Sequence, residues 1–150
     1  MSSYLRLLAM TVLSFLSMYI LMYAMVDRFA NVYPNVNQIY MAGLMTAPMV
    51  LIELGLMGAM YKNGQANIAI TAVSVIALVG CWVFIRQQSG VGDRQFLKSM
   101  IPHHAGAILM CGKAPVEDRR IRDLCATIIR GQQSEIDQMN AILRDLDARS

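Results

Sequence analysis

The stretch ANIAITAVSVIALVGCWVFI, residues 66–85, contains no charged side chain and is followed directly by Arg86. A helix of about 20 residues rises about 30 Å, which is the thickness of the hydrocarbon core of a bilayer. Trp82 lies near the end of the stretch, as aromatic residues at a membrane surface often do. We therefore expect a transmembrane helix over about residues 66–86.

Two earlier stretches have the same character. Residues 4–26 carry one charged side chain, Arg6, and residues 39–61 carry one, Glu53. A cleaved signal peptide would have a shorter apolar core and a small-residue cleavage site, so we expect the first stretch to remain as an anchor. The sequence predicts three membrane crossings within a membrane domain of residues 1–88.

The charged residues are concentrated in the last third of the chain. Only 15% of all residues are charged, against about a quarter in soluble proteins, and most of them follow residue 92. Residues 89–150 are therefore expected to form a soluble domain. Its basic residues alternate with acidic ones and the net charge is only +3, so we expect no nucleic acid partner.

The soluble domain is predicted to be a helical hairpin. Residues 89–92 form a short linker, and Asp93 is a suitable N-cap for a helix over about residues 94–111. Residues 112–115, Gly-Lys-Ala-Pro, indicate a turn, and a second helix is expected over about residues 115–147.

Such a hairpin has little core of its own. We therefore expect an all-α protein in which two hairpins form a four-helix bundle, as a homodimer or higher homo-oligomer. Packing of the hairpin against the membrane helices is the alternative, and Gly131 is a candidate bend in the second helix.

The three cysteines, Cys81, Cys111 and Cys125, form no CxxC pair. Neither a zinc knuckle nor a disulfide scaffold is indicated, and the odd number leaves at least one thiol without an intramolecular partner.

The first soluble helix carries a line of soft metal ligands. At 100° per residue, Met100, His103 and Met110 share one surface, whereas His104 and Cys111 fall on the adjoining, more buried side. Thioether and imidazole groups together favour Cu(I) or Ag(I) over magnesium, calcium or zinc. The alternative is that the methionines are core residues and the histidines make ordinary polar contacts.

The predicted turn also sets which residues face each other. A turn centred near Lys113 places His104 level with Cys125, and Met139 level with about Ser89. On this basis Cys125 is the ligand candidate within one chain, and Met139 is a candidate that acts across a dimer.

The segments FLKSMIPHHAGAILM and IIRGQQSEIDQM resemble the CopM-like copper-binding domains, a bacterial family long described as a domain of unknown function. The resemblance covers about residues 93–146 and implies copper binding through Met and His in a helical bundle in the periplasm or at the cell surface. Soluble copper proteins of this family carry the pattern twice, whereas this chain carries it once. The matching residues are Phe96, Leu97, Met100, Ile101, Pro102, His103, His104, Gln132, Glu135, Ile136 and Met139.

The second apolar stretch contains Met41, Met45, Met49 and Met57 at intervals of four or eight residues, with Glu53 between them. Such a stripe suits helix packing, and it could also pass Cu(I) through the membrane. A carboxyl group near mid-span is costly unless it is paired, so Glu53 is a candidate intramembrane polar site together with Met45 and Met49. We favour packing over transport.

These features predict a membrane-anchored copper-binding protein for sequestration, resistance or handover, with membrane lipid and copper-handling proteins as partners. A metal-free scaffold and a Cu(I) transport component are the alternatives. We expect no enzyme, because no phosphate loop or oxyanion loop is present. Counting Lys and Arg favours a cytoplasmic tail, whereas the resemblance favours a periplasmic tail on a multi-pass bacterial inner-membrane protein. We follow the resemblance, because Arg94 and Lys98 belong to a folded domain.

Overall fold

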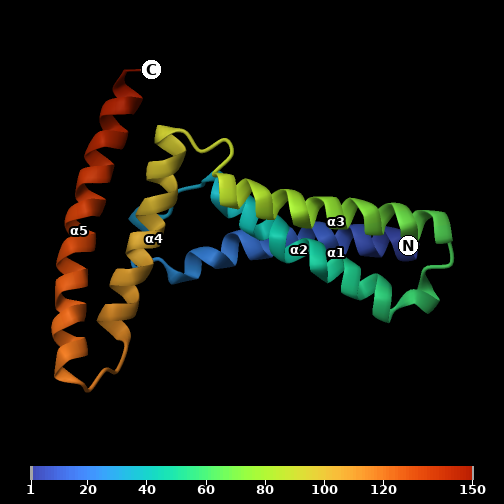
Figure 1. The fold of residues 1–150 in the computed structure, drawn as a ribbon, viewed down its shortest axis with the longest axis horizontal. Helices are drawn as coiled ribbons and strands as arrows, with labels where there is room; N and C mark the ends of the chain where they lie inside the picture. The colour runs from blue at the N-terminus through green and yellow to red at the C-terminus, as the bar shows by residue number, and fades with distance from the viewer. Residues whose placement is uncertain (1, 150) are drawn as a thin grey trace. The chain divides into compact units, whose positions relative to one another are not determined.

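The computed structural model describes residues 2–149 and contains helices but no strand among them (Figure 1). This confirms the predicted all-α class. The five α-helices are α1 (Ser3–Leu21), α2 (Val36–Leu56), α3 (Gly64–Gln87), α4 (Asp93–Lys113) and α5 (Arg119–Ala148). The 3-10 helices are η1 (Met22–Met25), η2 (Phe29–Asn31) and η3 (Gly58–Met60).

Three segments are long and apolar enough to cross a membrane, Ser3–Met25, Val36–Leu56 and Gly64–Gln87. The prediction of three such helices is confirmed, although the second is shifted toward the N-terminus. It ends at Leu56 instead of Tyr61, because the glycines of the following segment favour a turn and the short helix η3.

The chain divides into two compact units. The membrane unit contains α1 up to Met22 together with Asn37–Ser89, and the soluble unit contains Tyr23–Val36 together with the residues from Gly90 onward. The segment Tyr23–Val36, named here the connector, thus belongs with the tail and not with the helices that it joins. Three crossings by these apolar helices would bring the connector and the tail out on one side, in agreement with this grouping.

The membrane unit has only a small buried cluster, formed by Leu7, Val50 and Tyr61. Between α2 and α3 the helices approach closely at Gly43, where an added Cβ would lie 2.8 Å from Cys81 Sγ. A glycine at this position permits the close backbone approach that membrane helices commonly use.

The soluble unit is built on the antiparallel pair α4 and α5 (Figure 1). The buried residues of each helix are spaced by about one or two helical turns, so that one face of each helix forms the core. Ile101 and Ile136 are almost fully buried at the centre. The predicted helical hairpin is therefore present, and its core residues are Leu97, Ile101, Ala105, Ile136 and Leu143.

The connector adds a third layer to this hairpin. Its Val26 and Tyr33 side chains pack against the hairpin core. The Tyr33 hydroxyl donates a hydrogen bond to Asn140 Oδ1 over 2.9 Å, and the Val36 backbone N–H donates to Gln95 Oε1 over 3.0 Å. The sequence predicted only a polar loop here, because a short segment without periodic apolar residues gives no sign of a tertiary partner.

The ends of the hairpin helices differ from the prediction. Gly92, not Asp93, is the N-cap of α4, and α5 begins only at Arg119, where the Asp118 side chain accepts a hydrogen bond from the Arg120 N–H. The helix α5 continues through Gly131, so the proposed bend is absent. The segment 114–118 therefore forms a longer turn than the sequence suggested.

Candidate metal centre on the helical hairpin

Two contacts fix the register of the hairpin. His104 of α4 lies against Glu135 of α5, and Cys111 forms a disulfide with Cys125 nearer the turn. The predicted register, which placed His104 level with Cys125, is therefore wrong. It assumed a turn at the end of α4, whereas the five non-helical residues 114–118 displace α5 along its partner.

Both ring nitrogens of His104 have partners. Nδ1 lies 2.9 Å from the carbonyl oxygen of Met100, and Nε2 lies 2.8 Å from Glu135 Oε2. A carbonyl oxygen and a carboxylate both accept hydrogen bonds, so each ring nitrogen of His104 faces an acceptor. The His104 side chain is mostly buried, whereas 56% of the Glu135 side chain is exposed.

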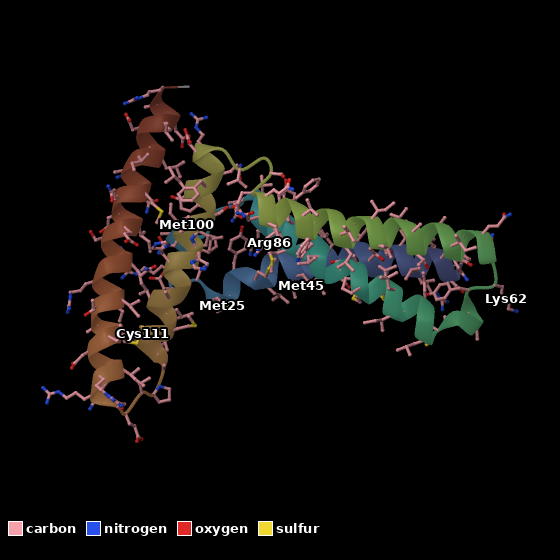
Figure 2. All side chains as sticks on the ribbon, viewed as in Figure 1. Met25, Met45, Lys62, Arg86, Met100 and Cys111 are labelled. Carbon is pink, nitrogen blue, oxygen red and sulfur yellow. A yellow bond between two sulfur atoms is a disulfide. The ribbon has the colours of Figure 1, made fainter. Side chains whose placement is uncertain are left out.

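His103 differs from its neighbour. It is exposed to solvent, and its ring centre lies 6.2 Å from that of His104. Met100, one turn earlier, is half-buried, and Figure 2 shows it on α4. Met100 and His103 are thus close enough in sequence to approach one ion from the same side of the helix.

Met110 shares the helix surface with His103 but not its level. It is 55% exposed. Seven helical residues separate the two side chains, and at 1.5 Å per residue this is a rise of about 10 Å. One ion with ligands at about 2 Å cannot bridge that distance without a large rearrangement, so Met110 belongs to a different site from Met100 and His103.

The structure also changes the roles of two α5 residues. Cys125 is not a free thiol beside His104, because its sulfur is bonded to Cys111 at the end of α4 (Figure 2). The sequence indicated no disulfide scaffold, and it did not predict this single disulfide, in which two cysteines 14 residues apart meet across the turn with their Cα atoms 5.0 Å apart. Cys81 is the free cysteine.

Met139 packs against the hairpin core and is not level with Ser89. The predicted placement outside the reach of the α4 residues was wrong for the same reason as the register. A packed methionine in this position is explained by filling the core, and a role across a dimer stays a prediction.

In the membrane unit, Glu53 accepts a hydrogen bond of 3.1 Å from the hydroxyl of Tyr61, which lies in the loop after α2. Burial raises the pKa of the Tyr61 hydroxyl, and the bond to Glu53 raises it further. Met45 is exposed and Met49 half-buried. Glu53 is thus paired, as the cost of a carboxyl group in lipid requires, and transport along these methionines stays a prediction.

Within residues 2–149, no group of three His, Cys, Asp or Glu side chains is arranged to hold a metal ion. A site within one chain therefore needs methionine sulfur, a second chain, or a rearrangement of the His104–Glu135 pair.

Sequence reasoning named Glu135 only among the residues that carry the resemblance and did not pair it with His104. The signal was present, because Glu135 and His104 belong to the two halves of the MIPHH and QSEIDQM pattern. Ile101 and Ile136 of the same two segments belong to one buried cluster. The spacing of the pattern thus has a structural reason as well as any chemical one.

Comparisons with known proteins agree with the division into two units. Residues 85–147 match the family model "Domain of unknown function (DUF305)". The chain is also 33% identical over 140 residues to the uncharacterized protein L153 of Acanthamoeba polyphaga mimivirus, which covers 91% of this chain and 90% of the viral protein. No solved structure matches the chain. The chain therefore belongs to the family of the mimivirus protein L153, and its residues 85–147 are similar to the DUF305 family.

Proposed function

We propose that this protein is a membrane-anchored copper-binding protein that binds Cu(I) or Ag(I) for sequestration, resistance or handover to copper-handling proteins. The observation that supports it is the position of His103, exposed on α4 one turn after Met100 and beside His104. An ion from solvent can reach this imidazole without unfolding of the helix.

The donor chemistry fits a soft monovalent ion. Met100 and His103 offer one thioether and one imidazole, a combination suited to Cu(I) and poor for zinc, which rarely accepts methionine. His104 becomes a third donor only when Glu135 moves away and Nε2 loses its proton. Because more than half of the Glu135 side chain is exposed, the carboxylate can move away from His104 into solvent without leaving a cavity in the hairpin core.

We place the protein in a bacterial inner membrane with the soluble unit in the periplasm. The Cys111–Cys125 disulfide supports this side, since disulfides persist in oxidising compartments and are rare in the cytosol. The location of the soluble unit can be tested by introducing a cysteine at an exposed α5 position such as Ala141 and labelling it in intact cells. Reaction with a membrane-impermeant maleimide is expected, and protection until lysis would place the unit in the cytoplasm.

The binding test uses the full-length, oxidised protein in detergent with Cys81→Ser, so that no free thiol contributes. Cu(I) is titrated against a chromophoric chelator. His103→Ala and Met100→Leu are each expected to weaken binding at least tenfold, because each removes one of two or three donors. Glu135→Gln is expected to strengthen binding, since it weakens the hold on His104 Nε2.

Met41→Leu is the matched control, because it removes an exposed methionine of α2 outside the candidate site. It is expected to leave the Cu(I) affinity unchanged. Equal affinities of the parent, His103→Ala and Met100→Leu proteins would reject the site.

A metal-free scaffold is the second candidate, and the exposed apolar side chains of the hairpin favour it. Phe96, Leu124 and Ile142 are between 44% and 57% exposed in the single chain. A second hairpin could cover them in a homodimer. Leu124→Asp is expected to convert a dimer to a monomer. Light scattering, corrected for the mass of bound detergent, measures this change as a lower protein mass. A monomeric parent protein would exclude this function.

A further inference from the structure

The Cys111–Cys125 pair lies apart from the Met100–His103 site. Cys111 is in the last turn of α4, and Cys125 is in the second turn of α5. Both side chains are half-buried, so neither is sealed in the hairpin core. We infer that this pair is a redox-gated second site, which binds one Cu(I) when the disulfide is reduced and none when it is oxidised.

The geometry gives a pair of ligands from two helices. The Cα atoms lie 5.0 Å apart, inside the range in which two cysteine sulfurs can meet at a common point. Two thiolates suit Cu(I), because thiolate is a ligand for soft ions and because Cu(I) accepts a low coordination number, whereas a zinc or iron site needs about four ligands. A hard ion would need more ligands than this end of the hairpin offers.

The charge around the pair suits thiolates. Lys113 and Arg122 lie within three residues of Cys111 and Cys125 respectively. Nearby cations stabilise a thiolate, which is the form that binds metals. The acidic residues at this end are Glu117, Asp118 and Asp123, of which Asp118 pairs with Arg120 and Asp123 with Arg119.

The chemistry balances with a dithiol as reductant. The dithiol transfers two electrons and two protons to the Cys111–Cys125 bond, which breaks to give two thiols, while the dithiol itself becomes a disulfide. Cu(I) then displaces the two thiol protons and forms two metal–sulfur bonds. In the reverse exchange a disulfide is the oxidant: it takes two electrons from the two thiolates and two protons from solvent to become a dithiol, the Cys111–Cys125 bond forms again, and the ion leaves as Cu(I). The redox state of the pair therefore sets whether the ion is held or released.

This inference does not depend on the Met100–His103 site, because the two sites share no residue. The test uses the full-length protein in detergent with Cys81→Ser, in an oxidised form and in a form reduced by a dithiol that is then removed under anaerobic conditions. Denatured protein is first assayed for thiols. None are expected per oxidised chain and about two per reduced chain.

Cu(I) is then titrated against a chromophoric chelator. The reduced protein is expected to bind about one more Cu(I) per chain than the oxidised protein. Cys125→Ser should abolish this difference, whereas His103→Ala should retain it. Alkylation of the reduced protein with iodoacetamide should abolish the extra Cu(I) binding without a substitution. Circular dichroism checks that the helices remain.

Three results would overturn the inference: two thiols in the oxidised chain, equal Cu(I) binding by both forms, or an undiminished difference after alkylation. The Met100–His103 site is decided separately, by the His103→Ala and Met100→Leu proteins.

Discussion

The membrane unit and the soluble unit are both helical, but their helices are held together by different means. In the three membrane segments only 6%, 22% and 6% of the most apolar windows are buried inside the structure. In the soluble unit, by contrast, Ile101 and Ile136 are almost inaccessible to solvent. Apolar side chains can remain in contact with lipid at no cost in free energy, whereas contact with water is unfavourable. The three apolar helices therefore need little protein core of their own.

Polar contacts do not divide the two units in this way. In the membrane unit Tyr4 bonds Asn67 near the helix ends, and the Thr46 hydroxyl lies within hydrogen-bond distance of the Ala42 carbonyl oxygen and of Met18 Sδ on α1. In the soluble unit some polar contacts stay within one helix, as between Gln133 and Asp137, and others join separate segments, as the Tyr33 bond from the connector to α5 does. The comparison teaches that the two units differ in how much apolar surface they bury, and not in the kinds of polar contact that they make.

The largest expected effect is on the soluble core. Ile101→Ala should destabilise the soluble unit by about 2–5 kcal/mol, because a fully buried side chain leaves a cavity. Amide hydrogen exchange of α4 and α5 peptides in detergent should accelerate accordingly. Ile76→Ala on α3, where the side chain is 71% exposed, is the matched control and should change stability by less than about 0.5 kcal/mol. Equal losses of stability from the two substitutions would show that the two units do not differ in how much they depend on buried side chains.

A smaller effect is expected at Gly43, where α2 approaches α3 closely. Gly43→Ala places a Cβ 2.8 Å from Cys81 Sγ, and overpacking of this kind costs about 1–3 kcal/mol. Thermal unfolding followed by Trp82 fluorescence measures the loss. In a Cys81→Ala background the same change should become neutral or stabilising, because alanine favours helix over glycine. A loss that persists in that background would mean that another neighbour is responsible.

The smallest effect concerns the connector. Tyr33→Phe removes the hydrogen bond to Asn140 and should cost about 0.5–1.5 kcal/mol. Exchange of the connector amides should rise more than that of the α4 core amides. A double-mutant cycle with Asn140→Ala isolates the pair. A coupling energy near zero would show that the connector is held by Val26 and the Tyr33 ring, and not by this bond.

The fold could be predicted from the sequence wherever a local sequence pattern is enough to decide it. Charge-free stretches such as residues 66–85 need a helix in lipid, because no water can satisfy their backbone groups. The regular spacing of apolar residues on α4 and α5 gave the hairpin in the same way. Both signals are local, so a single chain is enough to reveal them.

The candidate site was predicted less well. Its α4 residues were found because they lie within one helical turn, whereas the α5 partners depend on the register of the hairpin. A turn over residues 114–118, in place of one centred near Lys113, exchanged Cys125 for Glu135 opposite His104 and brought Cys125 to Cys111. Composition does not fix turn length, and an error of a few residues changes every cross-helix pair.

The sequence by itself determined that this chain has three apolar helices, a helical hairpin, and a strip of soft donors on α4, because helix period and hydrophobicity are properties of short segments. Only the tertiary structure decided that the connector packs on the hairpin, that His104 meets Glu135, and that two cysteines form a disulfide. Those contacts join residues distant in sequence, and their free energy arises only when the whole soluble unit packs together.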